Sequence, residues 1–181
     1  SVAAIFETGT EKVFYDENDW SDPNSSKISN YAKSKTLAEK AAWDFVEQEN
    51  NPFEFTVINP ALVIGPSLSG DLGVSNTAIE MVVTGKMPVA IPIQFGFVDV
   101  RDVASAHVLA MENKSSNGER FALAECDLWY KDIAKLLREN GFKKAPTFAV
   151  PVWLAKIMAN FNQQLKVTAP YLGRVRSVAK T

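Results

Sequence analysis

The chain has 181 residues, of which 46% are hydrophobic and 22% are charged, enough to bury a core and to exclude a disordered tail or a collagen-like fibre. A formal net charge of −2 argues against a dedicated nucleic-acid or anionic-membrane surface. One Cys and one His exclude a disulfide framework and any Cys- or His-based metal site, so we expect no metal.

The start of the sequence carries no targeting signal. It has no initial Met, no basic segment and no long apolar run. No apolar stretch of the sequence is long enough to cross a bilayer. We therefore expect a cytoplasmic protein without a membrane partner. The abrupt apolar start at Ser1 also suggests a piece of a longer chain.

The first thirty residues predict little regular structure. The apolar run 2–6 is typical of the end of a buried strand, and the polar, turn-rich residues 7–30 predict a long surface loop in which Trp20 contacts the core.

A helix is predicted from Tyr31 to about Gln48, with Ser29 or Asn30 as its cap. Its expected apolar stripe consists of two rows, Leu37, Ala41 and Phe45 beside Ala38, Ala42 and Val46.

Short apolar strands and helices alternate along the rest of the chain. Strands are expected at 53–58, 96–100, 121–124 and 148–150, and helices at 78–84, 101–111, 131–140 and 151–165. This alternation predicts an α/β fold with a mostly parallel sheet. In the helix expected at 101–111, the inward residues should be Val103, Ala106, Ala110 and Met111. The helix expected at 151–165 has an apolar face formed by Trp153, Leu154, Ile157, Met158 and Phe161. We expect this face to belong to the core of a substrate domain, with a substrate wall or a dimer contact as the alternative.

Tyr31 and Lys35 form the most informative short pattern. Residues four apart on a helix lie side by side, so the ammonium of Lys35 is expected beside the phenol of Tyr31. A nearby cation stabilises the phenolate and makes the phenol a better proton donor and acceptor near neutral pH. From spacing alone, a solvent-exposed helix start with a lysine placed by chance explains the pattern at least as well as a catalytic pair does.

Two further segments give the pair a context. A buried strand runs into Asn59-Pro-Ala-Leu-Val-Ile-Gly-Pro66, and Phe97-Val-Asp-Val-Arg-Asp-Val-Ala104 follows. With Tyr31 and Lys35, these segments resemble the extended short-chain dehydrogenase/reductases, most closely the group of dihydroflavonol, cinnamoyl-CoA, methylglyoxal and aldehyde reductases. The resemblance runs from Ser1 to about Gly173 and implies a Rossmann-like fold.

The resemblance also implies an enzyme that reduces an aldehyde, a ketone or a dihydroflavonol-like carbonyl with NADPH, preferred here over NADH. Tyr31 matches the family's proton donor, Lys35 the residue that tunes it and binds the nicotinamide ribose, and Ser1 the residue that polarises the carbonyl. The segment that meets the nicotinamide corresponds to Pro60, Ala61, Leu62 and Val63, and a further cofactor contact to Ser75. Substrate-binding segments are expected around 67–95 and 125–173, and the apolar character of the first favours a small or aromatic substrate.

One departure from the family matters. The Gly-rich phosphate loop of these enzymes has no counterpart, since Gly65, Gly70 and Gly73 are spaced wrongly and follow the wrong element. We therefore interpret residues 1–181 as part of a Rossmann-type domain that is inactive by itself, from a monomeric or homodimeric enzyme. Two alternatives stay open: an NAD-dependent epimerase, dehydratase or hydroxysteroid dehydrogenase of the same superfamily, and a non-catalytic binding module.

The remaining reactive side chains have simpler explanations. His107 is expected to be structural and Cys126 to fill a strand end. Asp99, Arg101 and Asp102 are interpreted as a helix cap with an ion pair rather than as ligand contacts.

Overall fold

The computed structural model describes residues 1–7, 12–50, 53–161 and 163–178. It divides into two compact units, each made of discontinuous stretches of chain. Unit 1 contains residues 1–61, 98–125 and 176–181, and unit 2 contains residues 62–97 and 126–175. Within the part of the chain that is described, no helix is both long and apolar enough to cross a bilayer.

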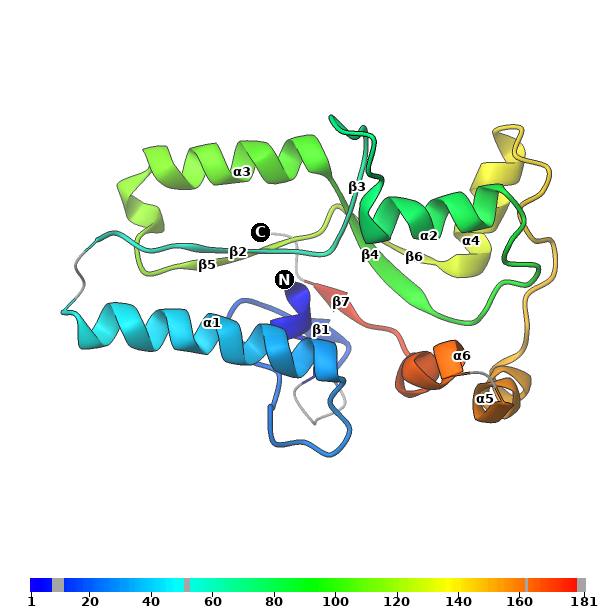
Figure 1. Ribbon diagram of the computed structural model, residues 1–181, viewed down its shortest axis with the longest axis horizontal. Helices are drawn as coiled ribbons and strands as arrows, with labels where there is room; N and C mark the ends of the chain where they lie inside the picture. The colour runs from blue at the N-terminus through cyan, green and yellow to red at the C-terminus, as the bar shows by residue number, and fades with distance from the viewer. Residues whose placement is uncertain (8–11, 51–52, 162, 179–181) are drawn as a thin grey trace. The chain divides into compact units, whose positions relative to one another are not determined.

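Unit 1 is built on a pair of parallel strands, β2 (Val57–Pro60) and β5 (Arg120–Leu123). Helix α3 (Val100–Glu112) lies on one face of this pair, and helix α1 (Asn30–Gln48) lies on the other (Figure 1). α1 runs in the direction opposite to β2, so that its first turn and the carboxyl end of β2 are at the same end of the unit (Figure 1).

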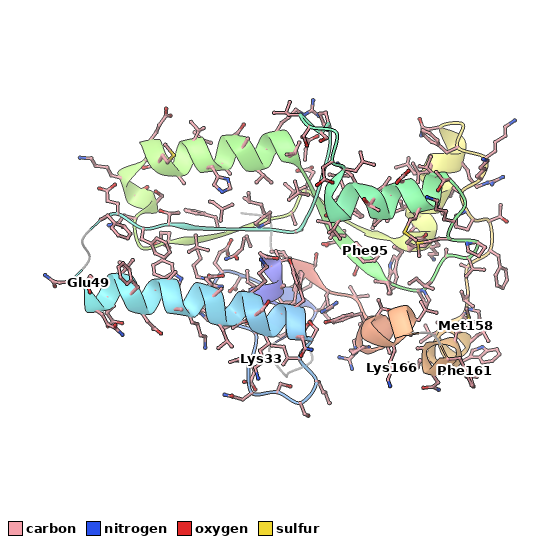
Figure 2. The ribbon with its side chains drawn as sticks, viewed as in Figure 1. Lys33, Glu49, Phe95, Met158, Phe161 and Lys166 are labelled. Carbon is pink, nitrogen blue, oxygen red and sulfur yellow. The ribbon has the colours of Figure 1, made fainter. Side chains whose placement is uncertain are left out.

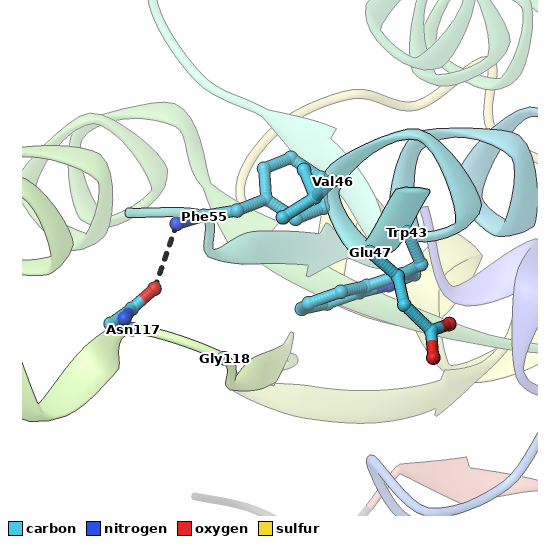
Figure 3. Close-up of a pocket in the computed structure, with 6 residues that line it drawn as sticks. All are labelled: Trp43, Val46, Glu47, Phe55, Asn117 and Gly118. Atoms are coloured by element: carbon cyan, nitrogen blue, oxygen red, sulfur yellow. Dashed lines mark hydrogen bonds between the residues drawn. The ribbon is translucent and has the colours of Figure 1, made fainter. Parts of the chain in front are cut away.

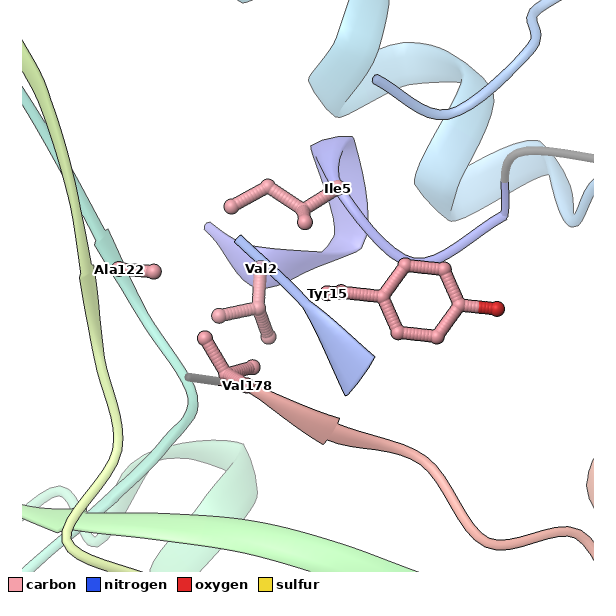
Figure 4. Packing of buried hydrophobic residues seen from close by; sticks show 5 residues of the cluster. All are labelled: Val2, Ile5, Tyr15, Ala122 and Val178. Atoms are coloured by element: carbon pink, nitrogen blue, oxygen red, sulfur yellow. The ribbon is translucent and has the colours of Figure 1, made fainter. Parts of the chain in front are cut away.

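Shorter elements complete unit 1. They are the 3₁₀ helix η1 (Val2–Ala4), a second 3₁₀ helix η2 (Lys114–Ser116), and the parallel strands β1 (Phe14–Tyr15) and β7 (Ser177–Val178). The core between η1 and the strands is formed by Val2, Ile5, Tyr15, Ala122 and Val178 (Figure 4). Burying these apolar side chains joins the first residues of the chain to β5 and β7.

A three-stranded sheet in the order β3-β4-β6 is the main sheet of unit 2, and its strands are Leu62–Ile64, Gln94–Asp99 and Cys126–Trp129. The last two residues of β4 are assigned to unit 1. β4 and β6 are antiparallel, with Phe97 opposite Cys126. The helices of the unit are α2 (Gly73–Val83), α4 (Tyr130–Glu139), α5 (Val152–Phe161), α6 (Gln163–Thr168) and the 3₁₀ helix η3 (Ala169–Tyr171).

Two apolar clusters stabilise unit 2. One joins α2 to α4 through Val82, Ala90, Tyr130, Ala134 and Ala145. The other joins the chain before β4 to α5 through Ile91, Ile93, Val150, Ala155 and Leu172. Burial raises the pKa of the Tyr130 phenol to about 12, and its hydroxyl lies 3.2 Å from the sulfur of Met87.

The sequence predicted most of these elements, but the start of the chain is different. Residues 2–4 form a 3₁₀ helix rather than the end of a strand, because the amides of Ala4 and Ile5 bond to the carbonyls of Ser1 and Val2. Residues 14–15, expected in a surface loop, form β1. Trp20 is half-buried, and the guanidinium of Arg120 lies 3.7 Å from the centre of its ring.

The buried face of α1 also differs from the prediction. Leu37 and Phe45, expected to be inward, are 47% and 53% exposed. The buried residues of α1 are Ala32, Thr36, Glu39 and Val46, of which Val46 alone belongs to the expected stripe. Thr36 can be buried because its hydroxyl donates to the carbonyl of Ala32, 2.7 Å away.

Three further expectations were wrong in detail. Met111, expected to be inward on α3, is exposed. The single helix expected over 151–165 is two helices, α5 and α6. On α5, Leu154 and Met158 pack against the second apolar cluster of unit 2, as expected of core residues. Phe161, in contrast, is 88% exposed (Figure 2), and Trp153 and Ile157 are exposed as well, so only part of this face is core.

Candidate active site

The first turn of α1 holds the tyrosine and lysine side by side. Ser29 caps the helix, since its hydroxyl accepts from the amide of Ala32 at 3.1 Å. The carboxylate of Glu7 in turn accepts from the amide and the hydroxyl of Ser29, at 2.6 and 3.1 Å. The Nζ atom of Lys35 lies over the ring of Tyr31, 5.6 Å from its centre. The predicted proximity of the two side chains is therefore confirmed.

Both polar groups of this pair are available to a ligand. Tyr31 is 60% exposed and Lys35 is exposed as well. Neither the phenol oxygen of Tyr31 nor the ammonium of Lys35 has a hydrogen-bond partner among the described residues.

Ser1 lies in the same unit, before η1. Its hydroxyl accepts from the amide of Ala3 at 3.4 Å, and its amino nitrogen donates to Oδ1 of Asn59 at 2.6 Å. Burial lowers the pKa of this amino group; the charge of Glu39 opposes the shift, and the charges of Lys35 and Arg120 add to it. No hydrogen bond among the described residues joins Ser1 to Tyr31 or Lys35.

The segment expected to meet the cofactor is divided between the units. Pro60 is the last residue of β2, opposite Leu123 of β5, and the amide of Ala61 donates to the carbonyl of Leu123 at 2.9 Å. Leu62 and Val63 continue the chain in β3, and Ser75 is a half-buried residue of α2; these three belong to unit 2. The structure thus joins Ser1, Tyr31, Lys35, Pro60 and Ala61 in one unit and assigns the other three to the second.

Sequence reasoning missed the buried polar residues behind Ser1 and Lys35. Asn59 is fully buried, and its amide nitrogen lies 3.4 Å from the carboxylate of Glu39. Glu39 also accepts from the Nε atom of Arg120 at 2.6 Å. One signal in the sequence could have indicated that Glu39 is buried. Glu39 follows Ala32 by seven residues and Thr36 by three, so the three residues share one face of the helix.

A second missed residue is Asn76, which neighbours Ser75 on α2. Its side chain accepts from the amide of Gly65 at 3.3 Å and donates to the carbonyl of Gly65 at 3.1 Å. These two bonds fix the turn after β3, where Gly65 has a φ of 136°.

The described residues of unit 1 line at least two hollows. The larger, about 450 Å³, is near the end of α1 that is remote from Tyr31 (Figure 3). It is lined by Trp43, Val46, Glu47, Phe55, Asn117 and Gly118. The smaller, about 150 Å³, is at the carboxyl end of β5 and is lined by Val98, Asp102, Ala122, Leu123, Ala124 and Glu125. The smaller one is at the strand ends where open α/β sheets bind ligands.

The simpler explanations for other reactive residues agree with the structure. Asp99 caps α3, and Arg101 donates to it from its side chain at 2.6 and 2.9 Å, which lowers the pKa of Asp99 to about 2. The Nδ1 atom of His107 lies 2.7 Å from the carbonyl of Val103, one turn earlier on α3. Cys126 is the first residue of β6.

Comparison with known proteins defines the class. Residues 1–124 match the model of the NAD dependent epimerase/dehydratase family, and the chain belongs to that family. The α/β fold and its Rossmann-like relatives agree with the fold expected from the sequence.

Particular relatives are reductases. The chain is 42% identical over 144 residues to cinnamoyl-CoA reductase CAD2 of Medicago truncatula, with 77% of this chain and 43% of that protein covered. It is 34% identical over 158 residues to NADPH-dependent methylglyoxal reductase GRE2 of Saccharomyces cerevisiae, with 77% and 46% covered. The crystal structure of Gre2 from Candida albicans matches with 27% identity and a TM-score of 0.74, over 100% of this chain and 55% of that one. The chain thus spans about half the length of these relatives.

Proposed function

We propose that this chain carries the catalytic Tyr31–Lys35 pair and part of the cofactor site of an NADPH-dependent carbonyl reductase. The observation that carries the proposal is the exposed phenol of Tyr31 beside the ammonium of Lys35 at a capped helix start. The names of the relatives, cinnamoyl-CoA reductase and NADPH-dependent methylglyoxal reductase, support the reaction type and the choice of NADPH.

The residues present fit a reduced nicotinamide nucleotide. Such a cofactor, when bound, supplies a hydride to the carbonyl carbon. The ammonium of Lys35 has hydrogen-bond donors to spare for ribose hydroxyls, since no described acceptor uses them. Pro60, Ala61, Leu62 and Val63 follow one another from the end of β2 into β3, where a nicotinamide ring would meet the main chain. Ser75 is proposed as a further cofactor contact.

In this mechanism Tyr31 is the general acid. Its Oη atom donates a proton to the carbonyl oxygen as the carbon gains the hydride, so that the C=O bond becomes a CH–OH group and the phenolate remains. Lys35 stabilises that phenolate because its positive charge lies over the same ring. The hydroxyl of Ser1 donates a hydrogen bond to the carbonyl oxygen and polarises it.

The test is Tyr31→Phe in the natural full-length protein, assayed for NADPH oxidation with a panel of aldehydes and ketones. We expect kcat to fall by about 10²- to 10⁴-fold, because the proton donor is lost. NADPH affinity is expected to stay close to that of the wild type. Retained turnover in Tyr31→Phe contradicts the role of Tyr31.

A matched pair of lysine variants tests the neighbour. Lys35→Met should lower kcat and weaken NADPH binding, whereas Lys33→Met, an exposed lysine on the same turn of α1, should change neither (Figure 2). If the wild type instead retains a tightly bound NAD that never exchanges and reduces no carbonyl, an epimerase or dehydratase reaction replaces the proposal.

A further inference from the structure

The charged residues of this chain are divided unevenly along its length. Residues 140–181 contain five Lys and two Arg, but neither Asp nor Glu. All 21 acidic residues of the chain lie in residues 1–139. The overall net charge of −2, which argued against an anionic-membrane surface, is therefore the average of an acidic region and a basic one.

Helix α5 carries an exposed apolar stripe within this basic region. Trp153, Ile157 and Phe161 follow one another at intervals of four residues and are 64%, 48% and 88% exposed. Another side of the same helix is core, since Ala155 and Ala159 are buried. α5 thus presents three large apolar side chains on a side that the core of unit 2 does not cover (Figure 2).

Lysines lie close to this stripe. Lys156 is exposed and follows Trp153 by three residues, so it lies at the edge of the same helix face. Lys166 is an exposed residue of α6, which packs against α5 (Figure 2). Neither lysine forms an ion pair with a residue in the described part of the chain. Segments 89–95 and 165–172, which supply the rest of the apolar cluster around α5, contain no acidic residue.

We propose that α5 is a peripheral binding site for an anionic phospholipid surface. Trp153, Ile157 and Phe161 insert at the boundary between headgroups and acyl chains, and Lys156 and Lys166 contact the lipid phosphates. α5 has 10 residues, so it lies in the plane of the interface and not across the bilayer. This site replaces the expectation, based on overall charge, that the protein has no membrane partner. It is independent of the proposed reductase activity.

The residue types favour a lipid surface over a protein or a nucleic acid. Protein interfaces are enriched in Arg and depleted in Lys, whereas an anionic leaflet attracts every Lys and repels every carboxylate. Most basic residues of 140–181 are Lys, and no acidic residue accompanies them. Nucleic acids stack on aromatic rings, but the centre of this stripe is the aliphatic Ile157. Trp and Phe on one helix face with Lys beside them are typical of an interfacial helix.

The first test measures binding of the natural full-length protein to vesicles by co-sedimentation. Vesicles of phosphatidylcholine with about 30% phosphatidylserine are compared with vesicles of phosphatidylcholine alone. We expect binding to the anionic vesicles, binding at least about tenfold weaker to the neutral ones, and release at about 0.5 M salt. Absence of binding to anionic vesicles at low salt overturns the proposal, also where the protein binds single-stranded DNA or an acidic peptide instead.

Charge variants test the lysines with a matched control. Lys156→Gln combined with Lys166→Gln should lower the partition onto anionic vesicles by about 10- to 30-fold, about fivefold for each charge. Lys27→Gln combined with Lys114→Gln removes two exposed lysines of unit 1 and should lower it by less than about twofold, because these lysines lie outside the basic region. An equal loss in the two double variants shows that net charge alone governs binding and overturns the proposal.

Apolar variants test insertion. Phe161→Gln should lower the partition about tenfold, whereas Met111→Gln, which changes an exposed apolar residue of α3, should leave it unchanged. Trp153→Phe should still bind, but the blue shift of tryptophan emission on anionic vesicles should be lost. If Phe161→Gln instead dissociates a dimer and leaves vesicle binding unchanged, a second copy of the chain covers α5 and the proposal is wrong.

Discussion

The two units bury different kinds of side chain. Among the described residues, the buried polar or charged ones are Ser21, Thr36, Glu39, Asn59 and Ser116, and all belong to unit 1. The buried side chains of unit 2 are hydrophobic, with the Tyr130 phenol as the most polar of them. Hydrogen bonds are directional and specify one arrangement, whereas apolar contacts are not and tolerate repacking. The interior of unit 1 therefore specifies side-chain positions through directional contacts, whereas the interior of unit 2 depends on apolar packing.

The largest expected effect comes from breaking the buried ion pair of unit 1. Arg120→Ala leaves the carboxylate of Glu39 buried without its cation, and we expect a loss of about 3–5 kcal/mol in the free energy of unfolding, measured by urea denaturation.

The matching control removes both charges. In Glu39→Leu with Arg120→Met, no buried charge is left unpaired, so much of the lost stability should return. If the double variant loses as much unfolding free energy as the two single variants together, the loss comes from packing and not from an unpaired charge. Polar contacts would then not distinguish the interior of unit 1 from that of unit 2.

In unit 2 the expected loss should follow the volume removed. Ile93 is buried in the cluster with Ile91 and Val150, so Ile93→Ala should cost about 2–5 kcal/mol of unfolding free energy in the same urea assay. Ile93→Val, which removes a single methyl group, should cost about 0.5–1.5 kcal/mol. A loss that does not scale with the atoms removed would indicate that unit 2 is as geometrically constrained as unit 1.

The features that the sequence predicted correctly are local ones. The helix from Tyr31 and the adjacency of Tyr31 and Lys35 depend on residues four apart, and the cap Ser29 is read from its neighbours. Helix periodicity, however, reports where apolar residues are and not which face is covered. It therefore assigned Leu37 and Phe45 to the interior.

The missed part of the site depends on contacts between distant residues. Asn59 and Glu39 are 20 residues apart, and Glu39 and Arg120 are 81 apart, so no window of sequence contains the ion pair. Charged residues are also rarely buried unless paired, and the partner cannot be seen from one sequence. The antiparallel pairing of β4 with β6 was missed for another reason. Strands that alternate with helices along a sequence favour a parallel sheet, and this general tendency does not hold for these two strands.

The smallest expected effect comes from an exposed ion pair in unit 1, and it tests whether burial is what makes the polar contacts of that unit strong. Asp99 accepts from Arg101, mainly from its side chain and next from its amide, and its pKa is lowered to about 2 from the ordinary 3.8. A carboxyl whose pKa is lowered in the folded state stabilises the fold above its unfolded pKa, and this contribution disappears as the pH falls through the folded pKa. Asp99→Asn keeps a helix cap but cannot ionise.

The difference in unfolding free energy between the wild type and Asp99→Asn should therefore be constant from neutral pH down to about pH 4 and shrink as the pH falls toward about 2. Urea unfolding at a series of pH values measures it. Arg101→Met removes the cation that lowers the pKa of Asp99, so in that background the pH dependence should weaken markedly. A difference that stays the same across the acid range would show that Asp99 acts as a neutral cap alone. Because this pair is exposed to solvent, its effect should remain well below that of Glu39 and Arg120, whose charges are shielded from water.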